Sequence, residues 1–207
     1  MSVIDKLATS LNRRDEVPNQ ELAQKIVATG DQRAVKELVE NLTNKNRGIQ
    51  SDCIKVLYEI GERNPALIAG YYKEFGSLLE SKNNRLVWGA MTALDTIALK
   101  EPQGVYNLLS KILKVADGES VIARDHAVGI LVKLGTLRQY KDNCLPLLIE
   151  QLIRCPNNQF PMYIEKSLLV IDEGNKPRFQ EVIKNRVDQL DKESQKKRVA
   201  KVLKKID

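Results

Sequence analysis

The sequence predicts an all-α protein built from stacked pairs of helices. Four leucines lie 37 residues apart in the 207-residue chain, at Leu57, Leu94, Leu131 and Leu168. Apolar or small residues recur three positions after and four positions before each leucine, which is the spacing of one buried helix face. A period of this length with two helical patterns inside it is typical of repeat proteins, in which each unit buries its apolar face against its neighbours.

Each period contains a first and a second helix. The second set of apolar positions has the same spacing and comprises Tyr71, Leu108, Leu145 and Val182. We expect the first helices near residues 2–13, 31–43, 65–80, 101–116, 142–154 and 177–190. We expect the second helices near residues 19–29, 47–60, 84–99, 120–134, 159–172 and 193–206. Gly61 and Gly135 are expected to end second helices, because glycine accepts the left-handed conformation of a C-terminal cap.

The pattern predicts one domain over residues 1–207. No stretch rich in Pro, Ser or Gly interrupts the repeats, and no segment alternates apolar and polar residues as a strand would. Aromatic residues make up 5% of the chain against 43% for all apolar residues, so the core should be aliphatic. We expect atypical capping repeats at about 1–30 and 176–207, because one face of each terminal unit meets water.

The sequence predicts no targeting segment. The first 15 residues contain no apolar stretch of the length that a secretory signal needs, and no apolar run approaches the roughly 20 residues of a membrane span. Three cysteines, at positions 53, 144 and 155, form no C-x-x-C pair. We therefore expect a reduced, cytoplasmic protein that does not bind a membrane.

Catalytic signatures are equally scarce. His126 is the only histidine, so zinc sites built from paired Cys and His cannot be assembled, and neither a phosphate-binding glycine loop nor a G-x-S-x-G motif occurs. We interpret His126 as a solvent-facing or rim residue of a second helix. The sequence predicts a protein that is not an enzyme and that uses no cofactor or metal.

Positive charge is concentrated at the C-terminal end. Residues 176–207 contain 11 Lys or Arg and 5 Asp or Glu, so they carry the whole net charge of +6. The last predicted helix contributes a basic patch, comprising Lys197, Arg198, Lys201 and Lys204. Two interpretations stay open: a solvated cap that replaces a missing neighbour, or a patch that binds phosphate or acidic groups.

Trp88 is the only tryptophan and lies outside the repeating apolar pattern. We expect it to be partly exposed. Off-core positions of the second helices that could join it in a partner-binding cluster are Lys55, Tyr58, Asp95 and Lys166. The alternative is ordinary packing of a large side chain between stacked helices.

One spacing recurs in three of the second helices. It reads Arg124-x-x-Ala127-x-x-x-Leu131-x-x-Leu134-Gly135, with counterparts Ala90-x-x-x-Leu94-x-x-Ile97-Ala98 and Cys53-x-x-x-Leu57-x-x-Ile60-Gly61. This pattern resembles HEAT repeats, which are close relatives of armadillo repeats. The resemblance covers nearly the whole chain and implies a right-handed α-α superhelix, or solenoid, of about six helix pairs. It also implies that the second helices line a concave face, so that the off-core positions share a groove.

The resemblance favours a non-enzymatic scaffold or adaptor that binds another protein or a peptide through that groove. Two alternatives come from the same family. Nucleic acid could bind the C-terminal lysine row. A DNA alkylpurine glycosylase group shares the helical repeats and uses aromatic residues and an aspartate in its cleft, which Trp88 and Asp95 match in part. The several tryptophans typical of that cleft are missing here.

Overall fold

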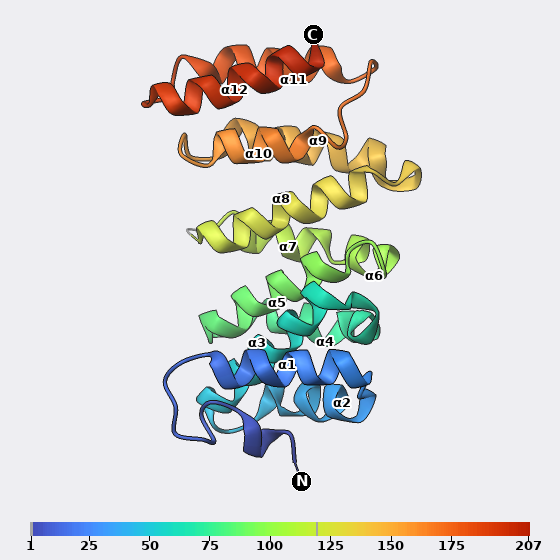
Figure 1. Ribbon diagram of the computed structural model, residues 1–207. Coiled ribbons are helices and arrows are strands. Elements are labelled where there is room, and N and C mark those ends of the chain that lie inside the picture. Colours follow the sequence, from blue (N-terminus) through green and yellow to red (C-terminus); the bar gives the residue numbers. More distant parts are fainter. Residues whose placement is uncertain (1, 119) are drawn as a thin grey trace. The chain divides into compact units, whose positions relative to one another are not determined.

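A computed structural model describes residues 2–118 and 120–207 of the chain (Figure 1). Within these ranges the secondary structure consists of α-helices and short 3-10 helices, without a strand, which confirms the all-α prediction. Contacts divide the chain into two compact units, residues 1–127 and residues 128–207, called the first and second unit below. That the two form a single domain stays a prediction.

The first unit begins without an α-helix, so the helix predicted over residues 2–13 is wrong. Only Ile4–Lys6 forms a 3-10 helix, η1, and turns follow it. The amide of Ala8 donates to the Asn19 side chain at 3.0 Å, and the amide of Thr9 donates to Asp52 at 2.7 Å. These two amides thus donate hydrogen bonds to side chains distant in sequence, and not to backbone carbonyls as they would in a helix. Leu7 is nevertheless fully buried.

The first unit continues as helix pairs in which the second member is the longer one. Its helices are α1 (Val17–Thr29), α2 (Gln32–Glu40), α3 (Arg47–Arg63), α4 (Tyr72–Leu78), α5 (Asn84–Ile97), α6 (Pro102–Asn107) and α7 (Leu109–Ala116). Short 3-10 helices are η2 (Asn41–Thr43), η3 (Pro65–Leu67) and η4 (Ala69–Tyr71), and α8 (Val121–Gly135) begins in this unit and ends in the next. The helix predicted over 65–80 is therefore broken into η3, η4 and α4, and that over 101–116 into α6 and α7.

Second helices pack against one another, as the repeat predicts. Helix α3 contacts both α1 and α5. Asparagine side chains cap two of them at the N-terminus: Asn46 accepts from the amide of Gly48 in α3, and Asn83 accepts from that of Arg85 in α5. Such caps satisfy amides that have no partner within the helix.

Two glycines let α3 and α5 approach closely. Gly61 lies inside α3 rather than at its end, and a Cβ there would collide with the side chain of Thr96. A Cβ on Gly89 of α5 would lie 2.5 Å from Cγ1 of Ile54, closer than real side chains pack. The left-handed caps predicted at Gly61 and Gly135 are therefore wrong, because Gly30 (φ 64°), which ends α1, is the one described glycine with a positive φ.

The second unit contains α9 (Arg138–Arg154), α10 (Phe160–Ser167), α11 (Lys176–Val187) and α12 (Glu193–Ile206). Helix α12 packs against both α10 and α11, and α11 packs against α9 (Figure 1). Arg186 of α11 is buried and donates to the carbonyls of Leu152, Ile153 and Cys155. These carbonyls belong to the C-terminal end of α9, where a cation also meets the negative end of the helix dipole.

The three cysteines are buried, and none of them is part of a disulfide. Burial raises the pKa of the Cys53 thiol to about 12 and that of Cys144 to about 11, so both stay protonated and unreactive at neutral pH. In the described part of the chain, no helix has the length and the apolar composition that crossing a membrane requires.

We predict that Leu94→Ala lowers the free energy of unfolding by about 2–5 kcal/mol, because it leaves a cavity at a fully buried position between packed helices. Chemical denaturation followed by circular dichroism measures this change. Leu169→Ala serves as the control, since that side chain is 73% exposed and its loss should change stability by less than about 0.5 kcal/mol. Equal effects of the two substitutions would contradict the assigned core.

Candidate partner-binding cavity

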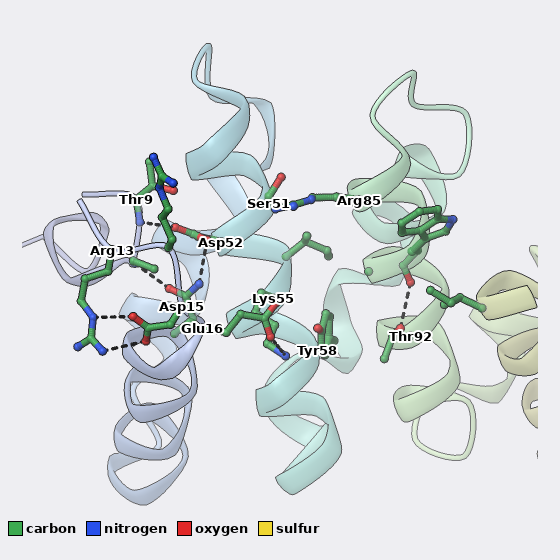
Figure 2. Close-up of a pocket in the computed structure, with 17 residues that line it drawn as sticks. Thr9, Arg13, Asp15, Glu16, Ser51, Asp52, Lys55, Tyr58, Arg85 and Thr92 are labelled. Atoms are coloured by element: carbon green, nitrogen blue, oxygen red, sulfur yellow. Dashed lines mark hydrogen bonds and ion pairs between the residues drawn. The ribbon is translucent and has the colours of Figure 1, made fainter. Parts of the chain in front are cut away.

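A cavity of about 590 Å³ opens in the first unit between the N-terminal segment, α3 and α5 (Figure 2). We call it the α3–α5 cavity. The 37-residue period explains its two helical walls, because it places Ser51 of α3 level with Trp88 of α5, and Lys55 level with Thr92. The N-terminal segment contributes Thr9, Arg13, Arg14, Asp15 and Glu16 to the lining. The helices also contribute Asn19 of α1, Asp52 and Tyr58 of α3, and Arg85 of α5.

Three of the five residues predicted to bind a partner meet in this cavity. Lys55, Tyr58 and Trp88 all line it, and Trp88 is half-buried, as expected from its off-core position. Asp95 is not part of the lining. Lys166 is a half-buried residue of α10 in the second unit. A binding role for these side chains remains a prediction.

Lys55 is held by acidic groups of the protein itself. Its Nζ lies 2.9 Å from Glu16 Oε2, 2.8 Å from Glu59 Oε1 and 4.8 Å from the centre of the Tyr58 ring. Burial alone would lower the pKa of the Lys55 ammonium, but hydrogen bonds to Glu59, Tyr58 and Glu16 raise it above its ordinary value. Lys55 therefore stays charged and ties Glu16 of the N-terminal segment to α3 (Figure 2).

Glu59 completes this charge network from the buried side. Arg63 donates to Glu59 Oε2 at 2.5 Å, on the carboxylate that also binds Lys55. Burial by itself raises the pKa of Glu59, yet the hydrogen bonds from Lys55 and Arg63 bring it below its usual value. Burial also raises the pKa of the Tyr58 phenol, which stays neutral. At neutral pH, Lys55 therefore lies beside an ionised Glu59 carboxylate and a neutral Tyr58 phenol.

Asn19 and Asp52 fix the N-terminal wall of the cavity. The Asn19 side chain is almost fully buried; its amide oxygen accepts from the amide of Ala8, and its Nδ2 donates to Asp52 Oδ1 at 2.8 Å. Asp52 Oδ2 in turn accepts from the amide of Thr9 (Figure 2). Every polar atom of this pair thus has a partner, and the segment needs no helix to be held in place.

Four further charges stand at the mouth of the cavity. Arg13 and Asp15 form a two-pronged ion pair, with contacts of 2.8 and 2.9 Å. Arg14 and Arg85 are exposed, and neither side chain has a hydrogen bond or ion pair to another described residue. Figure 2 shows the Arg85 side chain reaching from α5 toward Ser51 of α3.

His126 is half-buried rather than fully solvent-facing, and its imidazole is engaged by the protein. Its side chain is 25% exposed and lies between two polar groups, with Nε2 at 2.9 Å from Thr92 Oγ1 and Nδ1 at 2.9 Å from Asp95 Oδ2. The imidazole joins the start of α8 to α5. Asp95 thereby orients a histidine rather than facing the cavity.

The predicted basic patch lies on α12 in the second unit and is only partly free. Arg198 forms a two-pronged ion pair with Glu165, at 2.8 and 2.5 Å, which lowers the pKa of that carboxyl. Lys197, Lys201 and Lys204 are exposed, and none of them pairs with a described carboxylate. Three lysines of the predicted four-residue patch thus remain available.

Arg14, Arg85 and the Arg13–Asp15 pair were missed as site residues by sequence reasoning. Arg85 could have been found, because it lies three residues before Trp88 and hence on the same side of a helix. The N-terminal residues carry no such signal, since their segment has no counterpart in the repeat. Among the residues described, no group of three or more His, Cys, Asp or Glu side chains is placed to hold a metal ion.

Solved structures with a similar fold include designed armadillo repeat proteins. A designed armadillo repeat protein matches 99% of this chain and 100% of its own length, with 14% identity and a TM-score of 0.67. A second, in complex with the peptide (KR)4, matches 91% of this chain and 87% of its own length, with 18% identity and a TM-score of 0.66. An engineered protein matches 100% and 99% of the two chains, with 19% identity and a TM-score of 0.63.

These similarities confirm a HEAT/armadillo-like repeat fold over nearly the whole chain. At such low identity they establish the fold alone. No protein-family model matches the sequence, and no curated protein matches it either.

We predict that Asn19→Ala frees the N-terminal wall of the cavity. The substitution removes the acceptor for the Ala8 amide and one donor to Asp52, at a cost of about 1–3 kcal/mol in the free energy of unfolding. Hydrogen exchange measured by NMR should become faster at the amides of Ala8 and Thr9. Asn185→Ala, at an exposed position of α11, is the control. Unchanged protection at Ala8 and Thr9 would contradict the assigned network.

Proposed function

We propose that this protein is a non-enzymatic scaffold that binds a peptide or an extended protein segment in the α3–α5 cavity. The observation that carries the proposal is the placement of Tyr58 and Trp88, two half-buried aromatic side chains, in the wall of one open cavity. Amphipathic aromatic residues are common anchors of protein interfaces because they offer large apolar area with few rotatable bonds.

The fold supports this proposal because a protein of similar fold binds a peptide. One structural neighbour is a designed armadillo repeat protein in complex with a peptide, so a stack of this kind can bind a peptide. In the present chain the side chains that line the cavity come from neighbouring second helices at positions one repeat apart. A ligand that runs across the helices would therefore meet successive repeats in turn.

The arrangement around His126 does not suit nucleophilic catalysis. Thr92, His126 and Asp95 follow the order of a nucleophile, a base and an orienting acid. Thr92 Oγ1, however, lies 3.0 Å from the carbonyl of Trp88, to which it donates within its own helix. It also stands in the middle of α5, where backbone amides bond to carbonyls one turn back and cannot stabilise an oxyanion.

The glycosylase alternative receives no support from these positions. The aspartate that the sequence suggested for such a site, Asp95, is absent from the lining that contains Trp88 and is bonded to His126. Asp15 and Asp52 do line the cavity, but both carboxylates already accept hydrogen bonds from the protein itself. We therefore keep the non-enzymatic scaffold as the conclusion.

We predict that peptides selected from a random displayed library against the wild-type protein lose affinity for Trp88→Ala by at least about tenfold, as expected for an aromatic anchor. Isothermal titration calorimetry measures the affinities. Leu99→Ala, which trims an exposed apolar side chain outside the cavity, is the matched control and should bind as the wild type does. Selected peptides that bind Trp88→Ala undiminished, or a library that yields no binder, would reject the proposal.

The C-terminal lysine row supports a second candidate function, nucleic-acid backbone binding. The specific observation is that Lys197, Lys201 and Lys204 are exposed on one helix without a described carboxylate partner. Lysines of this kind attract phosphates without reading sequence, and the binding weakens as salt is added.

If this second function holds, affinity for a generic DNA duplex should fall about fortyfold between 50 and 200 mM salt, as expected when about three lysines contact phosphates. Lys197→Glu with Lys201→Glu should abolish the binding in an electrophoretic mobility or anisotropy assay. The control, Lys45→Glu with Lys114→Glu, makes the same charge change at exposed positions of the first unit and should retain it. A flat salt response eliminates this function.

A further inference from the structure

We propose that the segment bound in the α3–α5 cavity is acidic, and that Arg14 and Arg85 receive two of its carboxylates on either side of an apolar or aromatic side chain that contacts Trp88. This inference rests on the proposed function and specifies the chemistry of the ligand. It follows from which charged groups of the cavity are already occupied and which are free.

The acidic groups of the lining are all engaged by donors of the protein. Asp15 accepts two hydrogen bonds from Arg13 and one from the amide of Val17. Glu16 binds the ammonium of Lys55, and Asp52 accepts from Asn19 and from the amide of Thr9. A basic ligand would have to compete with these internal partners for each carboxylate.

The basic groups divide into two pairs. Arg13 and Lys55 are neutralised by carboxylates of the protein, as the contacts of Asp15, Glu16 and Glu59 show. Arg14 and Arg85 have no such partner among the described residues, although both line the cavity. Each guanidinium presents five N–H donors in a planar fork that matches a carboxylate, so two binding positions for anions remain open.

The two free guanidiniums come from different walls. Arg14 belongs to the N-terminal segment that Asn19 and Asp52 hold against α3, and Arg85 belongs to the first turn of α5. Trp88 lies one helical turn after Arg85, and Tyr58 lies on α3 beside Lys55 (Figure 2). A peptide with acidic residues around an apolar one could use both arginines and the aromatic wall.

The experiment compares three peptides of equal length that share one central leucine and differ in the flanking residues: glutamate, serine or lysine. Trp88 is the only tryptophan of the chain, so its fluorescence reports occupancy of the cavity directly, and calorimetry confirms each affinity. We expect the glutamate peptide to bind at least about tenfold more tightly than the serine peptide, with a preference that shrinks as salt rises.

Arg14→Glu and Arg85→Glu should each weaken binding of the glutamate peptide by about threefold to tenfold, as expected for exposed charges, and the double variant should prefer the lysine peptide. Arg33→Glu, at an exposed position of α2 outside this cavity, is the matched control and should bind as the wild type does. Circular dichroism verifies that all variants keep their helicity.

Two failures are distinguishable. Binding at Trp88 by the serine or lysine peptide as tightly as by the glutamate peptide would overturn the acidic preference while leaving the peptide-binding scaffold in place. A Trp88 signal that no peptide changes, together with a displayed library that yields no binder, would overturn both. Glutamate-peptide binding that Arg14→Glu and Arg85→Glu leave intact would overturn the assignment of the two arginines.

Discussion

The close packing of α3 against α5 is the constraint on which the rest of the first unit depends. Leu57 and Leu94 are fully buried, and Gly61 and Gly89 leave no room for a side chain where the helices approach each other. Because the two helices are one 37-residue repeat apart, fixing this contact also fixes which off-core residues stand side by side. The two helical walls of the α3–α5 cavity are therefore a consequence of the repeat itself.

The sequence predicted the elements that repeat and missed those that do not. Periodic apolar positions located every long second helix, because burial of one helix face dictates both the spacing and the fold. The same periodicity suggested a helix over residues 2–13, where Leu7 is indeed buried. What decides the conformation there is the capture of the Ala8 and Thr9 amides by Asn19 and Asp52, and partners so far along the chain leave no local signal.

The candidate site was predictable to a similar extent. Tyr58 and Trp88 could be placed on one face because they occupy equivalent sides of consecutive second helices. Sequence could not reveal that Asp95 turns to His126, since a histidine at a position without a periodic pattern gives no indication of its partner. Nor could it show which charges neutralise one another, because ion pairs such as Lys55 with Glu16 join segments that follow no common register.

The charged side chains of the cavity differ in whether they are already paired within the protein. Lys55 was selected from the sequence as a partner-binding residue, yet its ammonium is shared between Glu16 and Glu59, so its first effect is to hold the N-terminal wall against α3. Removing a charge from such a pair would leave its acidic partners uncompensated, whereas an exposed arginine without a partner gains from each new carboxylate. The net charge of the cavity thus combines charged groups that are paired within the protein with charged groups that can still bind a ligand. In this cavity the first kind includes Lys55 and Arg13, and the second kind comprises Arg14 and Arg85 among the described residues. Selectivity for an acidic segment would then follow from the pairing pattern rather than from the total charge of the chain.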